Sequence, residues 1–138
     1  MPFVTSIDMS PRVGMTPNRA IFLYHLRVNP GKVSQVTGIL KSSLGEMCAI
    51  GLACDAFKIP MTRWEKIEAG YDETFDPYSV LAAKVEVPRD AIVHLYYLND
   101  SENLTFKQVA RLAELYFNSN QAESVKTIWR KLKEKGEF

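Results

Sequence analysis

The chain has 138 residues, of which 46% are hydrophobic and 24% are charged, and these values fit one globular domain with its own core. They exclude a disordered tail and a miniprotein that depends on disulfides. The formal net charge of +1 creates no overall acidic or basic field, so a nucleic-acid or acidic-surface role would depend on a local patch.

Residues 1–15 contain two prolines and show no clean periodicity, so they predict an extended N-terminal arm before a single globular domain at 16–138. The arm lacks the basic start and continuous apolar core of a signal peptide. No stretch of the chain approaches the roughly 20 apolar residues that cross a bilayer. We therefore expect a cytoplasmic protein without membrane association.

The first helix is predicted to begin at Thr16 and Pro17 and to continue to Leu26. Threonine can cap the free amides of the first turn, and proline at the first helical position gives up no hydrogen bond. The Asn-Pro-Gly run at 29–31 ends this helix. Residues 32–41 then favour a short extended or β segment, because they are rich in β-branched side chains.

The middle of the chain is predicted to contain two helices separated by an irregular lobe. Apolar residues from Met47 to Phe57 favour a short buried helix. Residues 61–87 mix acidic and aromatic side chains and are interrupted by glycine and proline, which favours short strands joined by turns or an irregular lobe. A further helix begins at the Pro-Arg-Asp run at 88–90 and extends to about Leu98.

The C-terminal part is predicted to be a helical hairpin. Thr105 and Gln108 have the spacing of a capping box, and the apolar residues after them recur at helical spacing until a polar turn at 118–120. A narrow apolar stripe from Val125 to Leu132 forms the last helix, which should pair with the preceding one. The expected fold class is therefore α+β, a mainly helical domain with about five helices, one short β segment and this hairpin.

Cys48 and Cys54 are the residues that most directly suggest chemistry. On a helix they lie about 9 Å apart along the axis, too far for a disulfide, so both should be free thiols in a reducing compartment. Together with His25 and His94 they offer zinc ligands by type. The five-residue gap between the cysteines exceeds the usual ligand spacing, however, and no metal site is predicted.

Cys48 is the better candidate for a nucleophile, because it lies near the start of its predicted helix. The alternative function is thus a small cysteine-dependent enzyme in which His94 acts as base and Asp55 orients it. His25 and Asp100 are further candidates for these two roles. Against this, the neighbours of Cys48 resemble core residues, and free cysteines are usually buried. Our preferred interpretation assigns no catalytic residue.

Gln35, Thr37 and Gly38 bring an amide, a hydroxyl and an open backbone together in one short segment, which suggests hydrogen bonds to a small ligand. The alternative is a loop whose side chains bond their own backbone. The chain contains no glycine motif of the Walker or dinucleotide type, so the corresponding nucleotide-binding folds are not expected. The sequence predicts no cofactor.

Two surface regions suggest contacts with macromolecules. Trp64 and Tyr71 belong to the acidic and aromatic middle, and such aromatic residues commonly anchor protein interfaces. Arg130 and Lys131 belong to a strongly basic last helix, which offers a second alternative, nucleic-acid binding through that helix. A solvated helix face explains the same charge, since the helix dipole favours cations near a C-terminus and no aromatic stacking platform accompanies them.

Four motifs in order resemble a family of small uncharacterised proteins found mainly in phages and prophages. They are GKVSQVTGIL at 31–40, CAIGLACD at 48–55, LND at 98–100 and FKQVA at 106–110. The family pattern has a glutamine and a glycine before a leucine, a CxLGxxCD core, an Asn-Asp pair and an FxxIA helix. The resemblance covers about residues 17–115, and the chain departs from the pattern at Val33, Val36 and Ile50.

The resemblance implies a phage context and a shared fold, without an assigned chemistry. It also implies that six residues form one cluster: Gln35, Gly38, Cys48, Asp55, Asn99 and Asp100. A structural role suits such a cluster, because Asn99 and Asp100 can bond the backbone of the loop that carries Gln35.

The predicted function is that of a phage-type accessory protein that acts by binding, with no turnover of its own. Its partner would be a host or anti-phage-defence protein, or a signalling nucleotide, in the host cytoplasm. The candidate binding residues are Gln35, Thr37, Gly38, Asn99, Asp100, Trp64, Tyr71, Arg130 and Lys131.

Overall fold

The computed structural model describes residues 14–138, so most of the predicted arm at 1–15 lies outside the described residues. Seven helices form within 14–138, and no sheet does. They are α1 (Pro17–Val28), α2 (Ala49–Ala56), α3 (Arg63–Glu68), α4 (Pro77–Val85), α5 (Arg89–Ser101), α6 (Phe106–Asn118) and α7 (Val125–Glu134). None of these helices is long and apolar enough to cross a membrane.

The α+β prediction is wrong, because the described part of the chain is helical. Residues 32–41 form no strand. Their only β-type pairings are isolated bridges from Gln35 and Lys41 to the same residue, Met47. Both sides of Met47 are thus occupied by one loop that turns back on itself through Gly38, whose φ is +82°. The β-branched side chains have no neighbouring strand to pack against, and β propensity depends on such context.

The prediction of strands or an irregular lobe at 61–87 is also wrong. Because that prediction placed no helix there, about five helices were expected and not seven. Two short helices lie there, α3 and α4. Thr62 and Glu65 form a capping box at the start of α3, and the Asp76 side chain accepts a hydrogen bond from Tyr78 N at the start of α4. Gly70 and Pro77, which suggested strand boundaries, instead lie just after the end of α3 and at the start of α4.

Other predicted elements are confirmed. The Thr16 side chain caps α1 by accepting a hydrogen bond from Arg19 N, and the Thr105 capping box starts α6. The α2 helix falls within the predicted range, and α5 begins after Pro88 but continues to Ser101. The C-terminal hairpin is present, since α6 packs against α7.

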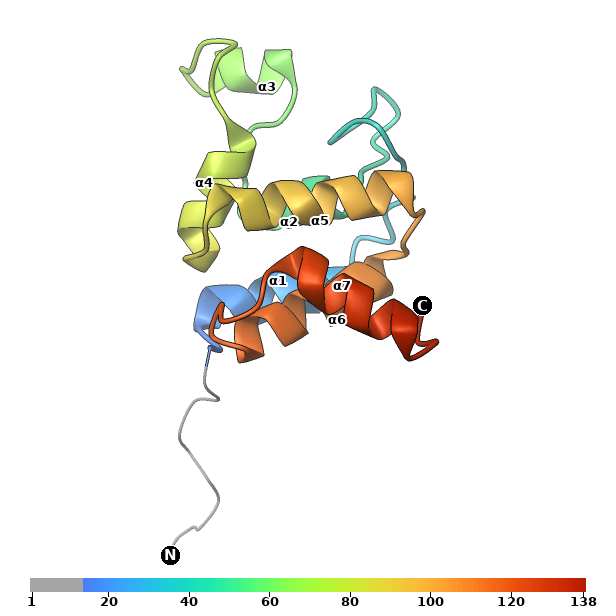
Figure 1. The fold of residues 1–138 in the computed structure, drawn as a ribbon. Coiled ribbons are helices and arrows are strands. Elements are labelled where there is room, and N and C mark those ends of the chain that lie inside the picture. Colours follow the sequence, from blue (N-terminus) through green and yellow to red (C-terminus); the bar gives the residue numbers. More distant parts are fainter. Residues whose placement is uncertain (1–13) are drawn as a thin grey trace, which may run out of the picture.

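The helices form two layers (Figure 1). α2, α4 and α5 lie over α1, α6 and α7, while α3 and the loop at 37–46 stand apart from each other at one end of the molecule. The α2 helix is the centre of the core, and its residues from Ala49 to Cys54 are all buried. A Cβ atom on Gly51 would lie only 1.9 Å from the carbonyl oxygen of Leu40, so this glycine lets the loop rest directly on α2.

Arg19 joins the two layers from inside the protein. Its side chain is 4% exposed and donates hydrogen bonds to the carbonyl oxygens of Val85 (2.7 Å), Glu86 (2.8 Å) and Gly14. The guanidinium also lies over the Phe117 ring, 5.0 Å from its centroid. The cation therefore meets the last carbonyl groups of α4, where the helix dipole favours positive charge.

Candidate functional site

Gln35 and Asn99 form a hydrogen-bonded pair that connects the loop before α2 to α5. The Gln35 side-chain NH₂ donates to Asn99 Oδ1 (2.8 Å) and to the Leu104 carbonyl (2.6 Å), and Gln35 Oε1 accepts from Phe106 N (3.2 Å). Asn99 is fully buried, and its Oδ1 also accepts from Ala49 N at 3.1 Å. Both side chains are thus hydrogen-bonded within the protein, where they hold the loop on α2 and α5.

Asp100 completes this arrangement at the end of α5. Asn99 Nδ2 donates to Asp100 Oδ1 at 3.1 Å and lies 3.5 Å from the Val36 carbonyl oxygen. Four of the six clustered residues therefore lie near one another: Gln35, Asn99 and Asp100 by these bonds, and Cys48 because it immediately precedes Ala49. The cluster organises the loop.

The residues proposed for cysteine catalysis are not assembled around one cavity. Cys48 is fully buried, and its Sγ accepts a hydrogen bond from Gly51 N (3.3 Å) as the cap of α2. Burial raises the pKa of Cys48 to about 11, so the thiol stays protonated at neutral pH. His94 lines a hollow beside Tyr97 and Lys126, and Asp55 lines another beside Lys58; neither hollow includes Cys48.

Metal binding finds no support within residues 14–138. No group of three or more His, Cys, Asp or Glu side chains is placed there so that it could hold a metal ion. Cys54 is buried as well, and burial raises its pKa strongly, which disfavours the thiolate that a metal requires.

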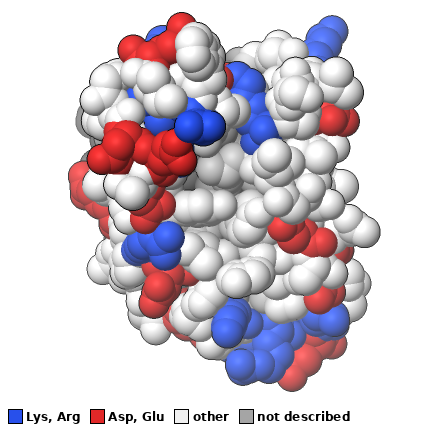
Figure 2. Space-filling model, turned by 90° about the horizontal axis from the view of Figure 1, so that it is seen from above, with Lys and Arg blue, Asp and Glu red and all other residues white. Residues whose placement is uncertain are grey.

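A cleft opens between the 37–46 loop and α3, and we call it the tyrosine cleft. Its volume is about 430 Å³. Residues 38–41 form one wall, residues 61–63 at the start of α3 form the other, and Tyr78 of α4 and Tyr96 of α5 complete the lining. Figure 2 looks down on this end of the molecule, with the hollow between the two raised segments. Gly38 is the predicted binding residue that belongs to this cleft.

The two tyrosines pack edge to face, with ring centroids 5.5 Å apart and an interplanar angle of 81°. Burial, followed by the neighbouring Tyr96, raises the pKa of Tyr78. Burial, followed by the nearby Asp100 carboxylate, raises the pKa of Tyr96. Both phenols therefore remain protonated at neutral pH, with the Tyr78 hydroxyl in hydrogen-bonding contact with Tyr96 and the Tyr96 hydroxyl in contact with Asp100.

Lys41 and Glu65 connect the two walls of the tyrosine cleft through an ion pair of 2.7 Å. Glu65 also accepts hydrogen bonds from Met61 N and Thr62 N through its other oxygen. Partial burial alone would raise the pKa of Glu65, but the hydrogen bonds from Lys41 and these two amides lower it overall. One carboxylate thus starts α3 and binds the opposite loop.

Exposed apolar residues are concentrated in the two segments that flank the tyrosine cleft, the 37–46 loop and residues 63–71. Of the nine large hydrophobic residues that are exposed within 14–138, five lie on the two flanking segments, and we call these five the apolar rim. They are Ile39 (48% exposed), Leu44 (85%), Trp64 (66%), Ile67 (46%) and Tyr71 (49%). The predicted binding residues Trp64 and Tyr71 belong to this rim. Tyr71 is positioned by the Phe75 ring, whose centroid lies 4.1 Å away.

The remaining predicted binding residues lie elsewhere. Thr37 is exposed and lines a separate hollow with Gln35, Asn103 and Leu104. Arg130 is exposed on α7, and Lys131 forms an ion pair with Glu123 close to its own helix. The ion pairs of the acidic middle region are with Lys41, Arg63 and Arg89.

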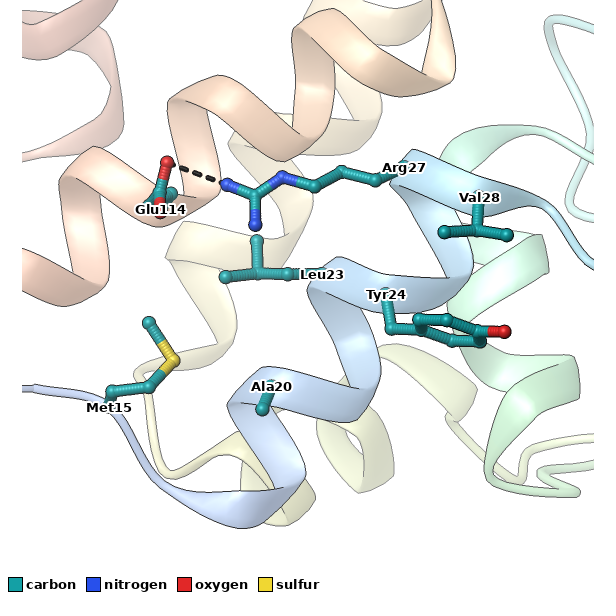
Figure 3. Close-up of a pocket in the computed structure, with 7 residues that line it drawn as sticks. All are labelled: Met15, Ala20, Leu23, Tyr24, Arg27, Val28 and Glu114. Atoms are coloured by element: carbon teal, nitrogen blue, oxygen red, sulfur yellow. Dashed lines mark ion pairs between the residues drawn. The ribbon is translucent and has the colours of Figure 1, made fainter. Parts of the chain in front are cut away.

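A further cavity of about 350 Å³ follows α1, lined partly by Met15, Leu23 and Val28 (Figure 3). Arg27 extends from α1 to Glu114 of α6 across this cavity and pairs with it at 2.6 Å. The two charges lining the cavity neutralise each other, so it offers a ligand no unbalanced charge. We therefore place the candidate site at the tyrosine cleft and apolar rim.

Sequence reasoning missed most residues of this site. The site residues that were not predicted are Ile39, Leu40, Lys41, Leu44, Met61, Thr62, Arg63, Ile67, Tyr78 and Tyr96. One available signal was the four-residue spacing of Tyr96 and Asp100, which places both on one side of α5. Comparison of the chain with protein-family models, with curated proteins and with solved structures found no match.

Proposed function

We propose that the protein acts by binding a protein partner through the apolar rim, without turnover of its own. It would work as a phage-type accessory protein, in the host cytoplasm, and its partner would be a host or anti-phage-defence protein. The observation that carries the proposal is that Ile39, Leu44, Trp64, Ile67 and Tyr71 are exposed on the two segments that flank one cleft. The motif order described above supports the phage context.

Residue type and exposure support a protein contact. Trp and Tyr are enriched at the centres of interfaces, and burying a large apolar side chain contributes about 1.5–3 kcal/mol. The helix that carries Trp64 and Ile67 has no buried residue of its own, so its sequence contributes little to the core. The Glu65 bonds nevertheless hold it in place, which reduces the entropy lost on binding.

The arrangement of the reactive groups supports binding over catalysis. Cys48 is buried and protonated, and the hollows lined by His94 and by Asp55 do not include it. Nucleic-acid binding through α7 receives less support, because Lys131 is paired with Glu123 and Lys133 lies over the Trp129 ring. The apolar rim remains the surface with the clearest chemistry for a partner.

Site-specific crosslinking tests the proposal. A photoreactive benzoylphenylalanine is placed at Ile67, and separately at Ile21 on α1, which is similarly exposed at 40% against 46%. Both variants are expressed in host cells, irradiated and analysed by mass spectrometry. A defined protein adduct from position 67 that is absent from position 21 is expected. The adduct should also disappear when Trp64→Ala is added, but not when Tyr97→Ala is added.

Adducts of equal yield and composition from positions 67 and 21 would contradict the proposal, since they indicate random collisions. Loss of the adduct with Tyr97→Ala but not with Trp64→Ala would place the interface elsewhere. Circular dichroism of each variant verifies that the fold is retained. Trp64 and Tyr97 are suitable for this comparison because both side chains are more than half exposed.

A further inference from the structure

The tyrosine cleft has an unusual balance of polar groups. The residues that line it include Lys41, Arg63, Thr62, Tyr78 and Tyr96, but no Asp or Glu. The neighbouring hollow at Asp55 and Glu65 has the opposite character, with two carboxylates and one lysine. Two cationic residues and three hydroxyl residues thus line the tyrosine cleft without an acidic one, and this set of residue types suits an anion.

We propose that the tyrosine cleft binds a small organic anion with a flat ring, of the nucleoside monophosphate class. The ring would lie against Tyr78 and Tyr96, and the anionic group would meet Arg63 and Lys41 at the two walls. Aromatic side chains accept a flat ring by stacking, and the planar guanidinium matches the oxygens of a phosphate.

The dimensions of the cleft agree with such a ligand. Its volume of about 430 Å³ falls in the range of roughly 300–1,000 Å³ that is typical of small-molecule sites. Leu40 and Met61 add apolar surface beside the tyrosines. A phosphate alone would leave this apolar surface in contact with water, so the cleft favours a molecule that combines a ring with a charge.

Both cations already have partners, and this determines how the ligand would bind. Lys41 pairs with Glu65 at 2.7 Å, and Arg63 pairs with Glu73 at 2.6 Å. The Arg63 and Glu73 side chains are 75% and 60% exposed, and ion pairs so exposed are weak. Glu73 is not part of the cleft lining, so Arg63 can turn from this carboxylate to a ligand at little cost.

This inference does not rest on the proposed protein contact. The apolar rim would bind a protein through outward-facing side chains, whereas the anion would use the donors inside the cleft. Ile39 is the residue that belongs to both. Failure of the crosslinking experiment leaves the anion site untouched, and failure of anion binding leaves the rim untouched.

Isothermal titration calorimetry of the full chain at low salt tests the site with four probes: AMP, phenyl phosphate, adenosine and inorganic phosphate. AMP and phenyl phosphate should bind, and adenosine and inorganic phosphate should bind at least about tenfold more weakly, because each lacks one of the two recognised parts. Tighter binding of AMP than of phenyl phosphate supports a nucleoside monophosphate, and equal or tighter binding of phenyl phosphate overturns that ligand class. No binding of either at millimolar concentration overturns the proposal.

Three substitutions locate the site. Arg63→Gln should weaken AMP binding at least about fivefold, since a charge-assisted hydrogen bond is lost. Glu73→Gln breaks the same ion pair but frees Arg63, so binding should stay equal or become tighter. Lys66→Gln removes a cation of the same helix that does not line the cleft, and binding should not change. If Arg63→Gln and Lys66→Gln have equal effects, the anion binds by general charge and the proposal is wrong.

Discussion

The Gln35 side-chain NH₂ donates a hydrogen bond of 2.8 Å to Asn99 Oδ1, and this bond joins the loop before α2 to the last turn of α5. Asn99 Oδ1 also accepts from Ala49 N, so one buried oxygen holds three segments of the chain. Because the 37–46 loop forms a wall of the tyrosine cleft, the shape of the cleft depends on this amide.

Asn99→Ala should therefore destabilise the fold by about 3 kcal/mol, because it leaves Ala49 N and the Gln35 amide without their buried acceptor. Urea unfolding followed by circular dichroism measures the change. Asn118→Ala, at an exposed position in the last turn of α6, is the control and should change stability by less than about 0.5 kcal/mol. Equal stability of the two variants would contradict the structural role of Asn99.

Gly51→Ala should destabilise the protein by about 2 kcal/mol or more, although alanine is usually preferred in a helix by about 0.5–1 kcal/mol. The added Cβ would lie 1.9 Å from the Leu40 carbonyl oxygen, so α2 and the loop must separate. Gly31→Ala is the control, because the nearest atom to its added Cβ is 3.6 Å away. Thermal unfolding compares the two, and a stabilised Gly51→Ala variant would show that the loop does not rest on α2.

Arg19→Lys should lower the unfolding free energy by about 2 kcal/mol, since an ammonium cannot reproduce the bonds to Val85, Glu86 and Gly14. Arg27→Lys preserves the charge in a more exposed ion pair, and its effect should remain below about 0.5 kcal/mol. Chemical denaturation of both variants gives the difference. A loss in Arg27→Lys as large as that in Arg19→Lys would argue against a special role for the buried guanidinium.

Cys48 should react slowly with iodoacetamide in the folded protein. Its pKa is raised from 9.0 to about 11, so the thiolate fraction at pH 8 falls from about one-tenth to about one-thousandth. Folding favours the neutral thiol of Cys48. The alkylation rate therefore increases and the unfolding free energy decreases as the pH rises from 9 towards 11. Peptide mapping after alkylation, with and without urea, measures the rates. Rapid labelling without urea would restore the enzyme hypothesis.

Local signals predicted those helices whose first turn carries its own cap. Thr16 with Pro17 and Thr105 with Gln108 satisfy backbone amides within four residues of sequence, so their effect is visible without the fold. The same kind of signal existed at Thr62 and Glu65. It was outweighed by the nearby glycine and proline, which punctuate helices as readily as strands.

The candidate site was less accessible to sequence reasoning because its parts come from separate elements. Tyr78 and Tyr96 belong to different helices, and their contact depends on how α4 packs against α5. Exposure was equally hidden. Ile67 suits a core by residue type, and only the position of α3 outside the two helical layers leaves it 46% exposed.

Protonation of the Glu65 carboxylate would affect both walls of the tyrosine cleft. Its carboxylate starts α3 through Thr62 and reaches the opposite loop through Lys41. Because its pKa is lowered, the contribution to stability is present above the ordinary carboxylate range and is lost as the pH falls below it. Acidification would therefore release α3 and the 37–46 loop together. The width of the cleft and the position of the apolar rim would then change over the same pH range.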